Sequence, residues 1–143
     1  MDEREFFYEF GKTLYKIDGF YAEYAKKSKV KENLLWILYA LNDGKSHSQK
    51  EICDGWDLPR TTVNTIVKEL EASKYVELSQ IKGEKRELEL SLTKSGKLYA
   101  EELLKGLYEI EKLAYNAINA SEVLRAMQNV LENLYKCEKE LIK

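Results

Sequence analysis

Apolar residues recur at helical spacing through the first quarter of the chain. They alternate at steps of three and four residues, the heptad-like pattern of a helix with one apolar seam. The seam consists of Phe7, Phe10, Leu14, Ile17, Tyr21 and Tyr24. A second helix is predicted over residues 30–41, and the Asn-Asp-Gly of residues 42–44 supplies a stop and a turn.

The last third of the chain carries two further helical stripes. One helix is predicted over residues 103–117, a break near residues 119–121, and a final helix over residues 123–141 with a broad apolar stripe. A stripe of that breadth needs two neighbours. The long helices at both ends carry more apolar surface than the small middle of the chain can cover. We therefore predict that they pack together and against a second copy of the chain, which gives a homodimer.

The middle of the chain has the pattern of two short helices. Ser48 followed by Glu51 three residues later is a capping-box pattern, and this helix is predicted to stop near Asp54 and Gly55. Pro59 stands where a second helix would begin, a place where its missing N–H costs nothing. Two helices joined by a tight glycine-containing turn are typical of a helix-turn-helix.

A period of two follows at once. Residues 76–80 and 88–92 alternate apolar and polar side chains, and between them lies the charged, glycine-containing stretch 82–86. This pattern predicts a β-hairpin with an exposed basic tip. The fold class is therefore mainly α with a small β-hairpin wing: a winged helix-turn-helix flanked by helices at both ends.

The second helix of this arrangement suits double-stranded DNA. Arg60 can donate two hydrogen bonds to guanine and Asn64 can pair with adenine. The neighbouring threonines fit phosphates or thymine methyl groups, and Lys68 and Ser48 fit phosphates. Arg86 in the predicted wing suits a narrow minor groove. The predicted DNA contacts are Ser48, Gln49, Arg60, Thr61, Thr62, Asn64, Thr65, Lys68, Lys85 and Arg86.

Two other interpretations stay open for these residues. Surface helices and loops commonly carry such side chains, so each of them alone fits a solvated surface. A winged helix can also serve as a protein-interaction module that binds no DNA. An adaptor of that kind would present exposed apolar residues on the second helix, where this chain has Arg60, Thr61, Asn64 and Lys68.

Residues 48–97 resemble the MarR family of winged-helix transcriptional regulators. The resemblance lies in Ser-Gln-Lys-Glu-Ile-Cys at 48–53, Pro-Arg-Thr-Thr-Val-Asn at 59–64, the helix end and following strand at 68–77, and Leu-Thr-Lys-Ser-Gly at 92–96. Arg86, seven residues before Thr93, matches the family's wing arginine. Glu84 stands two positions before it, where the family usually has an aspartate.

The resemblance covers nearly the whole chain and implies an organisation. Residues 1–143 would form one domain, with a DNA-binding lobe over 30–97 and a helical dimerisation region over 1–27 and 98–143. The resemblance implies that the protein is a homodimer and that it binds a pseudo-palindromic operator sequence in duplex DNA. Many members of the family are repressors that a small aromatic or phenolic effector releases from DNA.

Aromatic residues near the junction of the first, second and fifth helices are candidates for such an effector site. They are Tyr21, Tyr24, Trp36, Tyr39 and Tyr108. A phenol ring can stack on an aromatic effector and also hydrogen-bond to it. The alternative, which we favour at this point, is that these side chains belong to a dimer core or are half-buried on helices.

Composition narrows the classes of function. The net charge of −2 argues against a nucleic-acid binder, but residues 45–97 carry ten Lys and Arg against nine Asp and Glu, a net of +1, and the remainder has −3. Affinity for DNA is therefore expected to be modest and salt-dependent. One histidine, His47, and two distant cysteines, Cys53 and Cys137, suggest no metal site.

The remaining expectations concern chemistry and location. Cys53 is expected to face inward as an inert thiol, and Cys137 to lie on an apolar seam. His47 is expected in a loop or near a phosphate. The sequence has no catalytic motif, so we expect no enzyme and no cofactor. Without an apolar run of membrane-spanning length or a signal peptide, we expect a cytoplasmic protein with no membrane partner.

Overall fold

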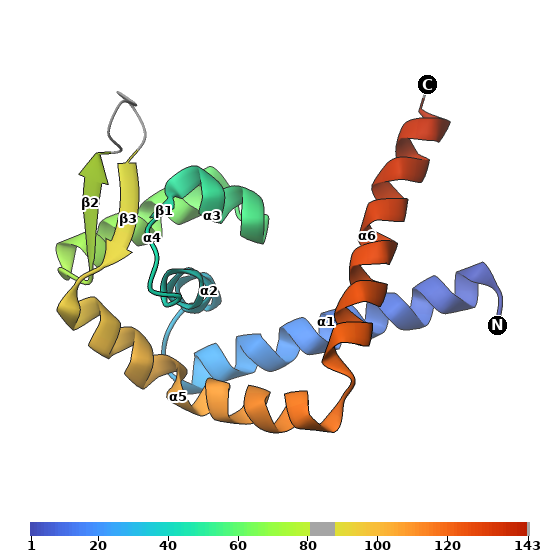
Figure 1. Ribbon diagram of the computed structural model, residues 1–143, viewed down its shortest axis with the longest axis horizontal. Coiled ribbons are helices and arrows are strands. Elements are labelled where there is room, and N and C mark those ends of the chain that lie inside the picture. Colours follow the sequence, from blue (N-terminus) through green and yellow to red (C-terminus); the bar gives the residue numbers. More distant parts are fainter. Residues whose placement is uncertain (81–87, 143) are drawn as a thin grey trace. The chain divides into compact units, whose positions relative to one another are not determined.

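The computed structural model describes residues 1–80 and 88–142 (Figure 1). The chain forms two compact units, Met1–Lys105 and Gly106–Lys143. The first unit holds the helix-turn-helix and the sheet. Helix α5, Lys94–Ala117, begins in the first unit and ends in the second, which also contains α6, Ala120–Leu141.

The first unit contains four helices ahead of α5 and a small sheet. The helices are α1 (Glu3–Lys27), α2 (Glu32–Leu41), α3 (Gln49–Trp56) and α4 (Arg60–Ala72). The strands are β1 (His47–Ser48), β2 (Val76–Gln80) and β3 (Leu88–Leu92). The predicted fold class is confirmed: a mainly helical chain with a winged helix-turn-helix.

The sheet is antiparallel in the order β1-β3-β2. Val76 pairs with Leu92 across the predicted hairpin, and His47 pairs with Leu90 on the other side of β3. Strand β1 was not predicted from the sequence, because two residues are too few to show a period of two. Pairing of β1 with β3 brings the start of α3 next to the middle of β3.

The core of the first unit lies between α2, α4 and the sheet. Four apolar residues on one face of α4 are at most 3% exposed: Val63, Ile66, Val67 and Leu70. Helix α2 buries four residues in the same way, and β3 buries Leu90. Since α4 buries one face only, its other side chains are left at the surface.

The turn between α3 and α4 differs from the prediction. Gly55 lies inside α3, which continues to Trp56, and the residue in the left-handed region is Asp57, with φ of 50°. Aspartate is among the few residues other than glycine that adopt this conformation readily. Pro59 is the N-cap of α4, just outside the helix. The turn therefore needs an aspartate where we expected a glycine.

A close backbone contact joins the end of α4 to the start of α5. Lys74 has φ of 61°, and its carbonyl oxygen accepts hydrogen bonds from the hydroxyls of Thr93 and Ser95. The Thr93 hydroxyl also accepts a hydrogen bond from the Gly96 N–H, which caps α5. Ser95 caps nothing and bonds to Lys74 instead. These bonds fix where the hairpin leaves α4.

The second unit ends in a helix with no core of its own. Asn119 caps α6, accepting a hydrogen bond of 3.3 Å from the backbone N–H of Glu122. None of the described residues of α6 is buried. Leu131, Leu134 and Tyr135 are all more than half exposed. The broad apolar stripe predicted for this helix is therefore present and uncovered in the single chain.

Candidate nucleic-acid interface

Helix α4 presents a polar surface on the side opposite its core face. Arg60, Thr61, Asn64, Thr65 and Lys68 are exposed, and Thr62 is half-buried. The Thr65 hydroxyl donates a hydrogen bond to the Thr61 carbonyl oxygen at 2.9 Å. The exposed side chains offer a guanidinium, an amide and an ammonium group, donors suited to base edges and phosphates.

A hollow lies between α3, α4 and the first residue of β3. Its lining residues are Gln49, Lys50, Cys53, Arg60, Thr61, Asn64 and Leu88. The structure thus brings together four predicted DNA contacts, from two helices. Sequence reasoning missed Lys50, Cys53 and Leu88. For the two residues of α3, helical spacing could have shown the grouping, since positions 49, 50 and 53 lie on one side of a helix. Nothing in the sequence placed Leu88 beside them.

A second hollow lies on the other side of α4, against the start of α2. Its lining residues are Lys31, Glu32, Asn33, Thr61, Thr62, Thr65 and Ile66. The Lys31 ammonium lies 3.5 Å from a Glu69 carboxylate oxygen. Burial raises the pKa of the Glu32 carboxyl, and the nearby Asp18 carboxylate raises it further. This hollow gathers the remaining predicted threonines.

The predicted phosphate contact Ser48 has another partner in the free chain. Its side chain is 3% exposed, and its hydroxyl accepts a hydrogen bond of 3.0 Å from the Glu51 N–H. The capping box is therefore formed on its Ser48 side. Lys85 and Arg86, the predicted wing contacts, and Glu84 lie outside the described residues.

Cys53 differs from the expectation, whereas Cys137 keeps its place on the predicted stripe of α6. Cys53 is half-exposed and lines the first hollow, so it does not face inward. The buried residue of this helix is Ile52. A short helix directs about one side chain per helical turn toward the core. Cys137 is exposed on α6, on a helix that buries no described residue.

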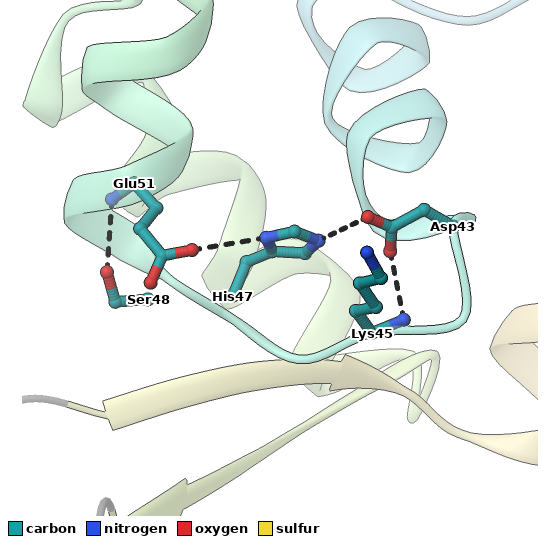
Figure 2. A network of polar contacts seen from close by, with 5 residues as sticks. All are labelled: Asp43, Lys45, His47, Ser48 and Glu51. Atoms are coloured by element: carbon teal, nitrogen blue, oxygen red, sulfur yellow. Dashed lines mark hydrogen bonds and ion pairs between the residues drawn. The ribbon is translucent and has the colours of Figure 1, made fainter.

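His47 bridges two carboxylates at the entrance to the helix-turn-helix (Figure 2). Its Nε2 lies 2.8 Å from an Asp43 carboxylate oxygen, and its Nδ1 lies 3.2 Å from a Glu51 oxygen. Burial raises the pKa of Asp43, but hydrogen bonds from the Lys45 N–H and from His47 outweigh it and lower that pKa below its usual value. His47 therefore ties the turn after α2 to the first turn of α3.

We expect this contact to stabilise the fold less in acid. The folded pKa of Asp43 lies below its unfolded value, so its contribution is complete above the unfolded pKa and is lost as pH falls through the folded pKa. The free energy of unfolding falls between pH 6 and pH 3, and replacing Asp43 by Asn should make this decrease smaller by about 0.5 kcal/mol. Urea unfolding across this range measures it, with Asp54→Asn as control. Equal slopes for the two variants would contradict the assignment.

Three of the predicted effector residues form an aromatic cluster with one that sequence reasoning missed. The Trp36 ring centroid lies 4.7 Å from that of Tyr21, 5.6 Å from that of Tyr39 and 5.2 Å from that of Trp56. Tyr24 donates its hydroxyl to the Leu103 carbonyl oxygen at 2.8 Å. Tyr108 is half-buried on the part of α5 that belongs to the second unit. Helix α3 supplies Trp56, so the cluster links α1, α2 and the helix-turn-helix.

The described parts of the chain contain neither a candidate metal-binding cluster nor a helix suited to spanning a membrane. Residues 1–80 and 88–142 contain no cluster of three or more His, Cys, Asp or Glu side chains arranged to hold a metal ion. Within the same ranges, no helix combines the length and apolar character needed to cross a membrane.

The fold and the exposed face of α4 define a winged helix-turn-helix protein. Comparison with known proteins shows which family the chain resembles. The sequence model of the MarR family matches residues 35–87. The structure of NMB1585, a MarR family regulator from Neisseria meningitidis, is 25% identical, covers 99% of this chain and 97% of its own, and superposes with a TM-score of 0.79. The chain is therefore similar to the MarR family of transcriptional regulators, over residues 35–87 in sequence and over nearly its whole length in fold.

Two further relatives are more distant or match in part. AbfR of Staphylococcus epidermidis is 18% identical, with 94% of this chain and 96% of its own covered and a TM-score of 0.75, and it has also been solved bound to DNA. The transcriptional repressor NicR of Pseudomonas putida is 31% identical over 85 residues, which are 59% of this chain. The match spans 54% of the length of NicR.

Proposed function

We propose that the chain is a homodimeric, sequence-specific DNA-binding repressor. The observation that carries the proposal is the surface of α4, where Arg60, Thr61, Asn64, Thr65 and Lys68 are exposed opposite a buried apolar face. An adaptor helix would expose apolar side chains there, so this surface favours DNA over a protein partner. The repressor NicR and the DNA complex of AbfR support the same function.

The direct test is a fluorescence anisotropy titration with duplex DNA. The first probe is the palindromic segment upstream of the protein's own gene, and the second is a scrambled duplex of equal length. We expect tighter binding to the first, with affinity falling steeply as salt rises because Lys and Arg release counterions from phosphates. Equal affinity for both duplexes, or binding that does not respond to salt, would contradict sequence-specific recognition.

The homodimer is supported by apolar surface within each unit. In the first unit, Phe7, Ile17 and Phe20 of α1 are between 43% and 49% exposed, and the uncovered stripe of α6 adds Leu131 and Leu134. Such surface on long helices marks an interface. The two-fold symmetry of a dimer would place two α4 helices on successive half-sites of a pseudo-palindrome.

We expect a Leu131→Glu, Leu134→Glu double variant to be monomeric at micromolar concentration, since two carboxylates per subunit cannot be buried without partners. Light scattering gives the mass. The control is Glu132→Gln, one residue away on the same helix and outside the apolar stripe. A wild-type chain that is monomeric, or a double variant that remains dimeric, would contradict this interface.

We further infer that a small aromatic or phenolic effector binds at the aromatic cluster and releases DNA. The cluster reaches from α1 to Trp56 at the end of α3, so an effector there can displace the helix-turn-helix. NadR, a structural relative, has been solved with 4-hydroxyphenylacetate. Both tryptophans of this chain, Trp36 and Trp56, lie in the cluster. Intrinsic tryptophan fluorescence therefore reports on this place alone.

Titration with 4-hydroxyphenylacetate and salicylate should quench that fluorescence, and the same concentrations should weaken DNA binding. A Trp36→Phe variant keeps an aromatic ring and reports through Trp56. If an acid releases DNA while the fluorescence of the wild type stays constant, the effector binds elsewhere. If neither acid does either, these two compounds are excluded as effectors.

A further inference from the structure

His47 contacts two carboxylates, one through each nitrogen of its ring (Figure 2). Its Nε2 lies 2.8 Å from an Asp43 carboxylate oxygen, and its Nδ1 lies 3.2 Å from a Glu51 carboxylate oxygen. A neutral imidazole carries a single N–H, so it can donate to one of these oxygens and turns a lone pair toward the other. The imidazolium carries two N–H groups and can donate to both. The geometry is therefore that of the charged ring.

Charged side chains on the segments around His47 come from the turn before β1, from the first turn of α3 and from β3. The carboxylates are Asp43, Glu51 and Glu89, and the cations are Lys45 and Lys50. The lysines and the positive end of the α3 dipole oppose a charge on the ring, and the carboxylates favour it. The ring makes its hydrogen bonds to carboxylates, so their attraction acts at the shortest range.

The bridge from Asp43 through His47 ends on the first turn of α3. This helix begins at Gln49, a predicted DNA contact, and Glu51 stands two residues later. Neighbouring residues of one helical turn lie closer together than the Debye length of about 8 Å. Loss of the ring proton therefore adds to the negative charge felt by phosphates near Gln49, and it also removes one of the two hydrogen bonds that hold this turn.

We propose that His47 is a proton-operated positioning residue, whose charged ring holds the first turn of α3 for DNA and whose loss of a proton weakens DNA binding. The proposal rests on the proposed DNA binding and adds a signal that regulates it. Solvent can supply the proton, since the His47 side chain is 22% exposed. Histidine is the side-chain type that ordinarily changes charge between pH 5 and pH 8, and His47 is the single histidine of the chain.

The first test compares the wild type with His47→Gln, which keeps a hydrogen-bonding side chain but cannot gain a charge. The probe is a duplex that the wild-type protein enriches from a random-sequence pool at pH 6, and Kd is read by fluorescence anisotropy at constant salt. Between pH 6 and pH 7.5 we expect the wild-type Kd to rise about threefold, the scale of a partly exposed ion pair. The Kd of the variant should stay constant. Parallel pH profiles would overturn the proposal, because a merely structural role changes Kd by one factor at every pH.

Two carboxylates of α3 separate the proton effect from a simple change of charge. Glu51→Gln removes one partner of the ring and keeps a residue suited to the capping box, so it should lessen the rise of Kd between pH 6 and pH 7.5. Asp54→Asn removes an equal charge from an exposed position of the same helix and should keep the wild-type profile. If both variants keep that profile, the contact between Glu51 and His47 does not carry the proton effect and the proposal is wrong.

Unfolding by urea in the absence of DNA tests the ring separately from the proposed function. The contribution of His47 is complete while the ring is charged and is partly lost as pH rises. The urea midpoint of the wild type, relative to that of His47→Gln, should therefore be higher at pH 6 than at pH 7.5. An equal difference at both pH values would overturn the proposal even if DNA binds. A wild-type chain that enriches no duplex contradicts the proposed function instead, and the unfolding comparison still decides whether the charged ring holds α3.

Discussion

Replacing Arg60 by Ala should weaken binding to the specific duplex by about thirtyfold or more. A bidentate arginine–guanine contact contributes about 1–3 kcal/mol, and the proposed homodimer would make two such contacts. Arg60 is exposed at the first residue of α4, where helix geometry directs it away from the core face of that helix. Anisotropy titrations on specific and scrambled duplexes measure the change, and the loss should be larger on the specific one.

Two further variants separate base reading from charge. Arg60→Lys keeps the charge but cannot form the two parallel hydrogen bonds, so it should lose discrimination between the duplexes while keeping most of the salt slope. Arg4→Ala removes an exposed arginine of α1 and should change neither. If Arg60→Ala weakens binding to both duplexes by the same factor, Arg60 contacts phosphate and not a base. Adding Arg86→Ala should weaken binding further.

The helices and the hairpin strands could be predicted because their periodicities extend over enough residues. The core face of α4 shows the same regular spacing, since Val63, Ile66 and Val67 are buried at steps of three and one residues. The ends of elements were harder. Helix α3 runs through Gly55, because one glycine costs a helix only about 1 kcal/mol and the turn is made by Asp57 instead.

The candidate site was predicted in part for a similar reason. Side chains on one helix can be grouped from sequence, so Arg60, Thr61 and Asn64 were found together. Lys50, Cys53 and Leu88 join them through the pairing of β1 with β3. A two-residue strand leaves no sequence signal, and without that pairing no pattern relates position 88 to position 53. Trp56 was missed in the aromatic cluster because it reaches Trp36 across separate helices.

Gly96 tests whether the joint between α4 and α5 sets the geometry of this surface. A Cβ atom at Gly96 would lie 1.8 Å from the Tyr75 carbonyl oxygen. That oxygen is backbone, and it accepts a hydrogen bond of 3.0 Å from the Thr93 N–H, so it cannot move alone. The rings of Tyr75 and Tyr99 also stack there, with centroids 4.4 Å apart. The only relief for a methyl group is to shift the start of α5 away from the hairpin.

We therefore expect Gly96→Ala to lower the free energy of unfolding by about 3 kcal/mol or more, among the larger effects of single substitutions. The control is Gly19→Ala in α1, where a Cβ would meet nothing within 4 Å and the better helix propensity of alanine should stabilise by about 0.5–1 kcal/mol. Urea unfolding followed by circular dichroism measures both. The opposite signs matter, because intrinsic propensity alone would stabilise both helices. A Gly96→Ala chain as stable as the wild type would show that α5 can move without cost, and the hairpin would then not be held in register with α4.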